Sequence, residues 1–189
     1  MEYEYKEGED YPYYETTGFS DAFVLAETHL CALDQNGQLV RDEIGNPILE
    51  CMCGNVISNR FDPSLPFFTG GGSFWTNSTS ELLATTTEAD RQARTRNRCN
   101  GEGDESVALI PLKTKQEIFG LIQLNDSRKD RFTPDLISLL ERITNQLTRA
   151  LGERKALEAL QRSESLLKTT ESLGRIGGWE WDVFKQTMF

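Results

Sequence analysis

The most regular run of apolar positions lies in the middle of the chain. ESVALIPL at 105–112 and IFGLIQL at 118–124 are apolar segments separated by a short lysine-rich stretch. Short apolar runs that are bounded by turn residues are typical of buried strands. Pro111 stands near the end of the first run, where a missing backbone donor is tolerated. The pattern predicts two strands joined as a hairpin.

A helical repeat follows this hairpin. Thr133 stands before Pro134, which is the order expected of a helix N-cap and first turn. Apolar residues then recur at steps of four and three, as expected for a seam that pairs two helices. The seam consists of Leu136, Leu140, Ile143, Leu147 and Ala150, and apolar positions continue at Leu157, Leu160 and Leu167. The second half is charged on most faces and predicts a coiled-coil connector.

The first third of the chain carries shorter signals. Alternating residues at 1–16 predict a hairpin, and Ser20 predicts the N-cap of a short helix toward His29. DQNG at 34–37 and EIGNP at 43–47 are turn motifs. These turns fold the chain back, so we expect Cys31 to return close to Cys51 and Cys53.

The segment between these turns and the central strands is rich in Gly, Pro and aromatic residues. Residues 62–80 predict a long structured loop with rings at Phe67, Phe68, Phe74 and Trp75. Ser80 or Thr79 is the predicted cap of a short helix, and the polar residues 87–99 predict another helix. Residues 173–189 switch to glycines and alternating aromatics, which predicts the first strand of a further domain.

Composition excludes several classes of partner. The net charge of -10 would repel a phosphate backbone, so no nucleic acid is expected. No apolar run approaches the ~20 residues of a membrane-spanning helix, and the acidic, aromatic start is not an export signal. We therefore expect a cytoplasmic chain with reduced thiols and no membrane segment.

The four cysteines leave several kinds of chemistry open. Cys31, Cys51, Cys53 and Cys99 would complete a tetrahedral zinc site, and an iron–sulfur cluster is a second possibility, although the one-residue gap between Cys51 and Cys53 is tighter than the usual ligand spacing. A thiol–disulfide switch among Cys51, Cys53 and Cys99 would also suit a sensor. Free cysteine is among the most frequently buried residue types, so a further interpretation is that the four thiols only pack in the core.

Three quoted stretches carry a family resemblance. ESVALIPLKTKQEIFGLIQLNDSRKDRFTPDLISLLERITNQLTRAL resembles the C-terminal half of a GAF domain. The stretch from LECMCGNV to RNRCNGEG is similar to a cysteine-containing GAF subgroup of bacterial and archaeal sensory histidine kinases. LGRIGGWEWDV looks like the opening of a PAS domain, a common next module in such kinases.

This resemblance implies a fold and a domain order. The expected fold class is α+β, with an antiparallel GAF-type sheet, flanking helices and a long connector helix at the end. We expect an N-terminally truncated GAF domain over residues 1–152, a signalling helix over 153–172 and the start of a PAS domain over 173–189. The chain has neither a phosphoacceptor-histidine helix nor nucleotide-binding glycine boxes, so no kinase activity is expected in it.

The resemblance also implies a binding site and partners. The residues expected to surround a small-molecule ligand are Cys53, Val56, Phe68, Phe74, Trp75 and Asn77. Some related kinases attach heme through a GAF cysteine, which makes Cys53 a candidate for that role. The seam residues Leu140, Ile143, Leu147 and Leu157 would form a parallel homodimer that signals to the PAS and kinase modules of the parent protein.

Three functions therefore stand beside one another. The first is a ligand- or redox-sensing GAF module, which includes a metal or heme sensor as a variant. The second is an enzyme with Cys53 as nucleophile, for which the single histidine would have to serve as base. The third is an inert module that only holds a dimer together.

Overall fold

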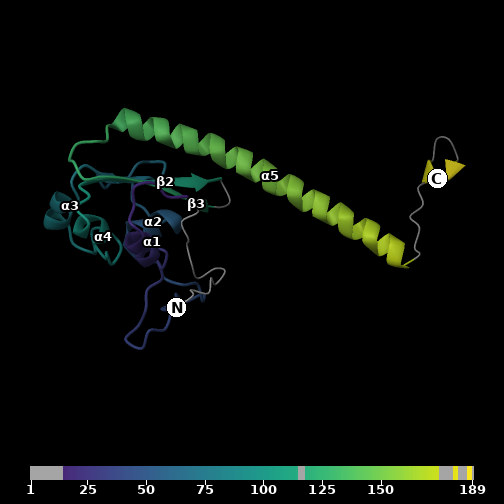
Figure 1. Cartoon of the computed structure of the whole chain (residues 1–189), viewed down its shortest axis with the longest axis horizontal. Coiled ribbons are helices and arrows are strands. Elements are labelled where there is room, and N and C mark those ends of the chain that lie inside the picture. Colours follow the sequence, from purple (N-terminus) through teal and green to yellow (C-terminus); the bar gives the residue numbers. More distant parts are fainter. Residues whose placement is uncertain (1–14, 115–117, 175–180, 183–186, 189) are drawn as a thin grey trace. The chain divides into compact units, whose positions relative to one another are not determined.

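A computed structural model describes residues 15–114, 118–174, 181–182 and 187–188 of the chain. The central feature is an antiparallel sheet of order β1-β2-β3, formed by Phe74–Thr76, Ser106–Lys113 and Ile118–Asp126 (Figure 1). Strands β2 and β3 pair as a hairpin along their whole length, with Ile110 opposite Ile122. The predicted hairpin at 105–124 is confirmed, and the α+β fold class with it.

Alternation along the strands divides the core into two clusters. Phe74, Val107 and Leu109 face one side of the sheet and pack with α2 (Cys51–Ile57). Trp75, Ala108 and Ile110 face the other side and pack against Phe132 and the start of α5 (Pro134–Gly174). Successive side chains of a strand point to opposite faces, which explains the division. Helices α2 and α5 accordingly lie on opposite sides of the sheet (Figure 1).

The short helices begin at side-chain caps. Ser20 accepts a hydrogen bond from the backbone N–H of Phe23 and starts α1 (Asp21–Glu27), as predicted. Helix α3 (Thr79–Thr85) is capped neither by Ser80 nor by Thr79, the two predicted caps, because Ser78 is the residue whose hydroxyl accepts from Glu81 N–H. Both caps satisfy an amide that the first turn of a helix leaves free.

Two predictions for the middle of the chain were wrong. Residues 62–80 are not all loop, because Phe74–Thr76 pair with β2. The helix predicted over 87–99 does not form, and a short helix α4 (Arg98–Gly101) stands at its end. The backbone of this segment bonds elsewhere: Arg94 C=O accepts from Cys51 N–H at 2.8 Å. The Arg91 guanidinium is buried and donates to Thr86 C=O at 2.7 Å.

The predicted turns fold residues 31–49 back on themselves. Asp34 accepts backbone N–H groups of Asn36 and Gln38, and Asp42 accepts those of Ile44 and Asn46. Cys31 consequently pairs with Leu49, two residues before Cys51. Cys31 and Cys53 share one core cluster, so the expected return of Cys31 is confirmed.

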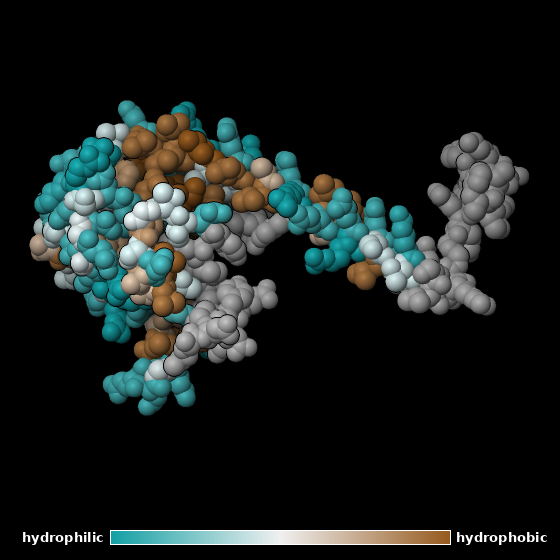
Figure 2. All heavy atoms as spheres, viewed as in Figure 1, coloured by the Kyte–Doolittle hydropathy of each residue, from teal (hydrophilic) through white to brown (hydrophobic). Residues whose placement is uncertain are grey.

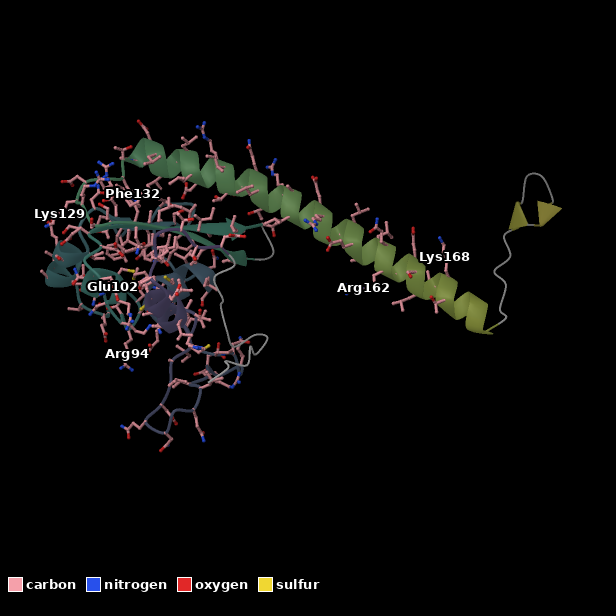
Figure 3. The ribbon with its side chains drawn as sticks, viewed as in Figure 1. Arg94, Glu102, Lys129, Phe132, Arg162 and Lys168 are labelled. Carbon is pink, nitrogen blue, oxygen red and sulfur yellow. The ribbon has the colours of Figure 1, made fainter. Side chains whose placement is uncertain are left out.

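Helix α5 begins where its cap was predicted, since Thr133 accepts from Leu136 N–H at 3.2 Å. Phe132, just before the cap, is buried beside the sheet (Figure 3). The chain divides into two units, residues 1–148 and 149–189. The second unit holds the rest of α5, from which Arg162 and Lys168 project (Figure 3), and a pairing of β4 (Trp181–Asp182) with β5 (Thr187–Met188).

Several predictions lie outside the described residues. The hairpin predicted at 1–16 falls almost entirely on residues 1–14, and most of the predicted opening of a PAS domain falls on 175–180 and 183–186. Within the ranges that are described, no helix is long and apolar enough to cross a membrane.

Candidate functional site

A small cavity of about 70 Å³ lies in the core of the first unit. Helices α2 and α3, strands β1 and β2, the end of α1 and residues 95–100 all contribute to its wall. Three cysteines, Cys51, Cys53 and Cys99, lie in the wall. Much of the rest is apolar and is formed by Met52, Phe74, Leu83, Val107 and Leu109.

Cys51 occupies the first position of α2 with an unusual backbone. Its φ of 61° lies in the left-handed region, which side chains with a Cβ rarely adopt. Residues 94–96 hold Cys51 in this conformation. The Cys51 N–H donates to Arg94 C=O, and the Cys51 Sγ accepts the N–H of Arg96 at 3.1 Å. Backbone strain of this kind is concentrated at functional sites.

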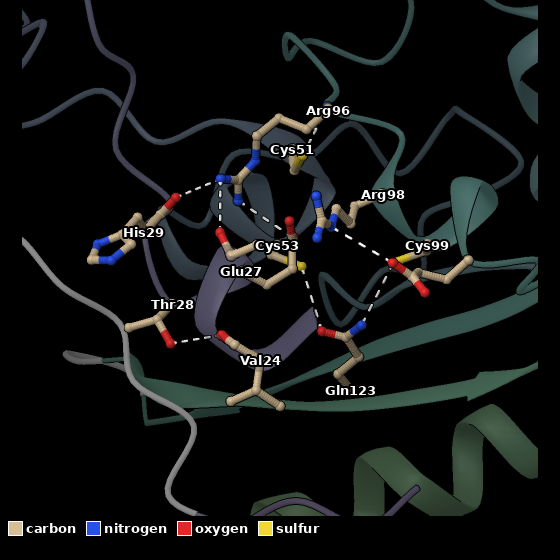
Figure 4. A network of polar contacts seen from close by, with 12 residues as sticks. Val24, Glu27, Thr28, His29, Cys51, Cys53, Arg96, Arg98, Cys99 and Gln123 are labelled. Carbon is tan, nitrogen blue, oxygen red and sulfur yellow. Dashed lines mark hydrogen bonds and ion pairs between the residues drawn. The ribbon is translucent and has the colours of Figure 1, made fainter. Parts of the chain in front are cut away.

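An ion pair between a buried carboxylate and a partly buried guanidinium lies beside the cavity at the end of α1. Glu27 is only 4% exposed, and its carboxylate lies 3.3 Å from the Arg96 guanidinium (Figure 4). Arg96 also donates to the backbone carbonyls of Ala26 and His29, which satisfies the end of α1. Burial raises the pKa of Glu27, and the positive charges of Arg96 and Arg98 oppose that rise. The pair joins α1 to residues 94–98.

Gln123 of β3 connects two of the thiols (Figure 4). The Cys53 thiol lies 3.9 Å from its Oε1 atom, and its Nε2 atom lies 3.6 Å from Cys99 Sγ. The same Nε2 donates to Asn125 at 3.1 Å, and Asn125 donates to Asp104 at 2.7 Å. A chain of polar contacts therefore runs from the cavity wall to the start of β2.

The thiols of this wall are held in their neutral form. Burial raises the pKa of Cys51 and raises that of Cys53 well above its usual range. Burial also raises the pKa of Cys99 to about 12. The thiolate is the nucleophile and the metal ligand, so neutral thiols are poor at both tasks. His29, the base that a Cys53 nucleophile would need, is not among the residues that line the cavity.

The cysteines are not assembled as a metal site. None of the four forms a disulfide bond, and Cys31 is not part of the cavity wall. Among the described residues, no group of three or more His, Cys, Asp or Glu side chains is placed to hold a metal ion. The zinc and iron–sulfur ligand set suggested by the sequence is therefore not brought together in this structure.

The residues predicted to bind a ligand are divided between the two sides of the sheet. Cys53 and Phe74 line the cavity, and Val56 and Phe68 lie in the same core cluster behind it. Trp75 packs in the opposite cluster. Asn77 clamps the chain before α5 by donating to Phe132 C=O and accepting from Phe132 N–H, at 2.8 and 2.9 Å.

The predicted seam residues lie on exposed parts of α5. Ile143, Leu147 and Leu157 are 43%, 47% and 55% exposed, whereas Leu140 is partly buried against the sheet cluster. Figure 2 shows hydrophobic side chains at the surface over the first half of α5. An exposed apolar stripe of this length is unusual for a face that stays in water.

Comparison with known proteins identifies the fold. The model of the GAF domain family matches residues 35–151, which is more than half of the chain. The chain belongs to the GAF domain family. The matched range contains α2, the sheet and the first part of α5, so most of the cavity wall lies within the GAF domain. GAF domains are typically regulatory modules and not catalytic ones.

One solved structure similar to this chain is a domain of a protein proposed to be a two-component sensor histidine kinase from Sinorhizobium meliloti 1021. The sequence identity is 18% and the TM-score is 0.37, over 65% of this chain and 81% of that one. No curated protein matches the chain.

Sequence reasoning found the thiols of the GAF cavity but missed its charged and amide groups. Glu27 and Arg96 are 69 positions apart, and nothing local pairs them. Gln123 stands in an apolar strand, IFGLIQL, and that polar interruption was the available signal. A polar residue on the buried face of a strand needs a partner, and here the partners are thiols and Asn125.

Proposed function

We propose that this GAF domain is the sensory input of a signal-transduction protein, with the cysteine-walled cavity as its ligand site. The observation that carries the proposal is the cavity itself, which is lined by several elements of the domain and joined to a polar network. In the proposal, two copies of the chain pair in parallel through α5. Helix α5 then transmits the response to a PAS domain and a kinase. The cysteine-containing subgroup of sensor kinases is the proposed source of this chain.

The size of the cavity limits the ligand. Sites for drug-sized molecules and cofactors are about 300–1,000 Å³. A cavity of about 70 Å³ is far smaller. A bulk water molecule occupies about 30 Å³, so the space suits a molecule of only a few heavy atoms. A cyclic nucleotide or a heme would require the walls to move apart.

The chemistry of the wall favours a neutral ligand. The charged residues of the wall are Glu27 and Arg98, and each has a counter-charge behind it: Arg96 lies 3.3 Å from Glu27, and Glu102 lies 3.9 Å from Arg98. The thiols of the wall are protonated. An ionised ligand in such a place would lose its hydration without gaining a free counter-charge. The proposed ligand is thus a small, neutral and largely apolar molecule.

Xenon is a suitable first probe because it binds dry apolar cavities. We expect xenon to shift the methyl resonances of Met52, Val107 and Leu109 in a saturable way. Val107→Ile adds a methylene to the cavity wall and should weaken the effect. Val40→Ile, the same change in the 31–49 hairpin, should behave as wild type. Cavity methyl resonances that do not respond to xenon would favour the inert dimerisation module instead.

A further inference from the structure

One carboxylate oxygen ties the loop before β1 to helix α5. Glu141 Oε1 accepts the hydroxyl of Thr69 at 2.5 Å and the hydroxyl of Ser73 at 2.6 Å. Ser73 is fully buried, with 0% exposure, whereas Thr69 and Glu141 are half-buried. Hydrogen bonds to an ionised acceptor are shorter and stronger than neutral ones. We call residues 69–73 together with Glu141 the latch.

The loop of the latch has a fixed shape. Thr69 N–H donates to Ser73 C=O at 2.9 Å, and Ser73 N–H donates to the Thr69 hydroxyl at 3.0 Å. Gly72 has a φ of +83°, which favours glycine. A Cβ on Gly71 would lie 2.6 Å from Glu141 Oε1, so the backbone passes directly against the carboxylate. The glycines allow the loop to close onto the helix.

The latch is adjacent in sequence to the cavity. Ser73 is followed by Phe74, the first residue of β1, which lines the cavity and is 3% exposed. Neighbouring side chains in extended chain point to opposite faces. Ser73 therefore reaches α5 while Phe74 faces the cavity, and a displacement of Phe74 moves the Ser73 hydroxyl with it.

Glu141 lies on the side of α5 that carries its buried residues. After Ile137, this side of the helix is largely polar. Thr144 and Thr148 are 2% and 1% exposed, and each donates its hydroxyl back to a carbonyl of its own helix, Glu141 and Thr144 respectively. Such bonds satisfy the hydroxyls without holding the helix to the sheet. The carboxylate of Glu141, by contrast, bonds across to the loop, and Leu140 and Ile143 of the proposed seam are close to it in the sequence.

We propose that the latch transmits occupancy of the cavity to α5. A ligand that displaces Phe74 pulls Ser73 from Glu141, and the released carboxylate lets α5 turn about its own axis. The inference rests on the proposed function, because it needs a ligand in the cavity. A ligand can bias this equilibrium only through different contacts with the latched and released states, and Phe74 supplies that difference. Glu141, Ser73 and Thr69 are positioning residues in this scheme.

The experiment records methyl and backbone amide spectra of the full chain as xenon is added. In wild type we expect two responses: shifts of the cavity methyls of Val107 and Leu109, and shifts of the α5 amides of Thr144 to Thr148. In Ser73→Ala and Glu141→Ala the cavity response should persist with the same saturation, and the α5 response should be lost. Glu153→Gln, an exposed change on the same helix, should keep both responses.

The possible results separate the two proposals. If the cavity methyls of wild type do not respond, the proposed function fails. If they respond and the α5 amides respond equally in wild type and in both latch variants, the latch is overturned while the ligand site stands. Glu141→Gln keeps the shape of the side chain and removes its charge. It therefore serves if the alanine variants do not fold, and it should weaken the α5 response.

Discussion

At the scale of single residues, the sequence shows which cysteines belong to the site but not how deeply their thiols are buried. Residue type and spacing were enough to single out Cys51, Cys53 and Cys99, which do line one cavity. Their protonation depends on burial by segments far apart in the chain, which no local pattern contains. The sequence therefore left zinc, disulfide and packing open, whereas the raised pKa values favour neutral thiols.

The raised thiol pKa values predict a loss of stability in alkali. The pKa of Cys99 rises from its ordinary value of 9.0 to about 12, so the unfolded chain releases this proton first as pH increases. The unfolding free energy should fall between these two values, by at most about 1.4 kcal/mol per pH unit for each such thiol. Urea denaturation followed across this interval measures the slope, and Cys99→Ala should reduce it.

Alkylation of the native chain gives an independent check on the same thiols. Because the thiolate is the reactive form, labelling at neutral pH should be slow at Cys51, Cys53 and Cys99 and fast once the chain is unfolded. One cysteine that is modified rapidly in the folded chain would contradict this view. It would restore the nucleophile or the redox switch as the function of the site.

At the scale of elements, local signal strength explains which predictions held. Strands β2 and β3 and helix α5 have long apolar patterns, and α5 also has a clear N-cap at Thr133. All three elements form where predicted. Helix α2 has no side-chain cap and contains Gly54, so its sequence favours a helix only weakly. Residues 87–99 have good helix formers, but their backbone is bonded to the start of α2. Tertiary contacts override propensity in both places.

Helix α2 should be sensitive to one added methyl group. A Cβ on Gly54 would lie 2.7 Å from Leu49 Cβ and 2.8 Å from the Leu49 carbonyl carbon, and backbone yields little. Gly54→Ala should destabilise the domain by about 1–3 kcal/mol, the usual cost of overpacking. Thermal or urea unfolding of the variant measures the loss.

Gly101 offers a matched control for this change. It is also helical, in α4, but has open space around its missing Cβ. Gly101→Ala should therefore be neutral or stabilising by up to about 1 kcal/mol. Equal losses in the two variants would mean that α2 is not packed against Leu49 as described.

At the scale of the whole molecule, the apolar stripe of α5 is the feature that calls for a partner. Replacing Leu147 and Leu157 by lysine places charge in the predicted seam, where it would have to be buried in a dimer. We expect the double variant to be monomeric by light scattering and wild type to be dimeric.

The control for this prediction uses the same helix and the same charge. Asn145 and Ala159 are exposed and lie away from the seam in the heptad pattern. Asn145→Lys with Ala159→Lys should leave the mass at that of wild type. A dimer that survives lysine at both Leu147 and Leu157 would show that this seam does not hold two copies together.

The unbroken course of α5, Pro134–Gly174, has a consequence for how the chain tolerates changes of length. In a continuous helix each added residue turns everything after it by about 100°. Seven residues bring the direction back to within about 20°, whereas three or four leave a seam out of phase. Insertions and deletions in this helix therefore act as changes of angle, and the spacing that matters along it is counted in heptads and not in ångströms.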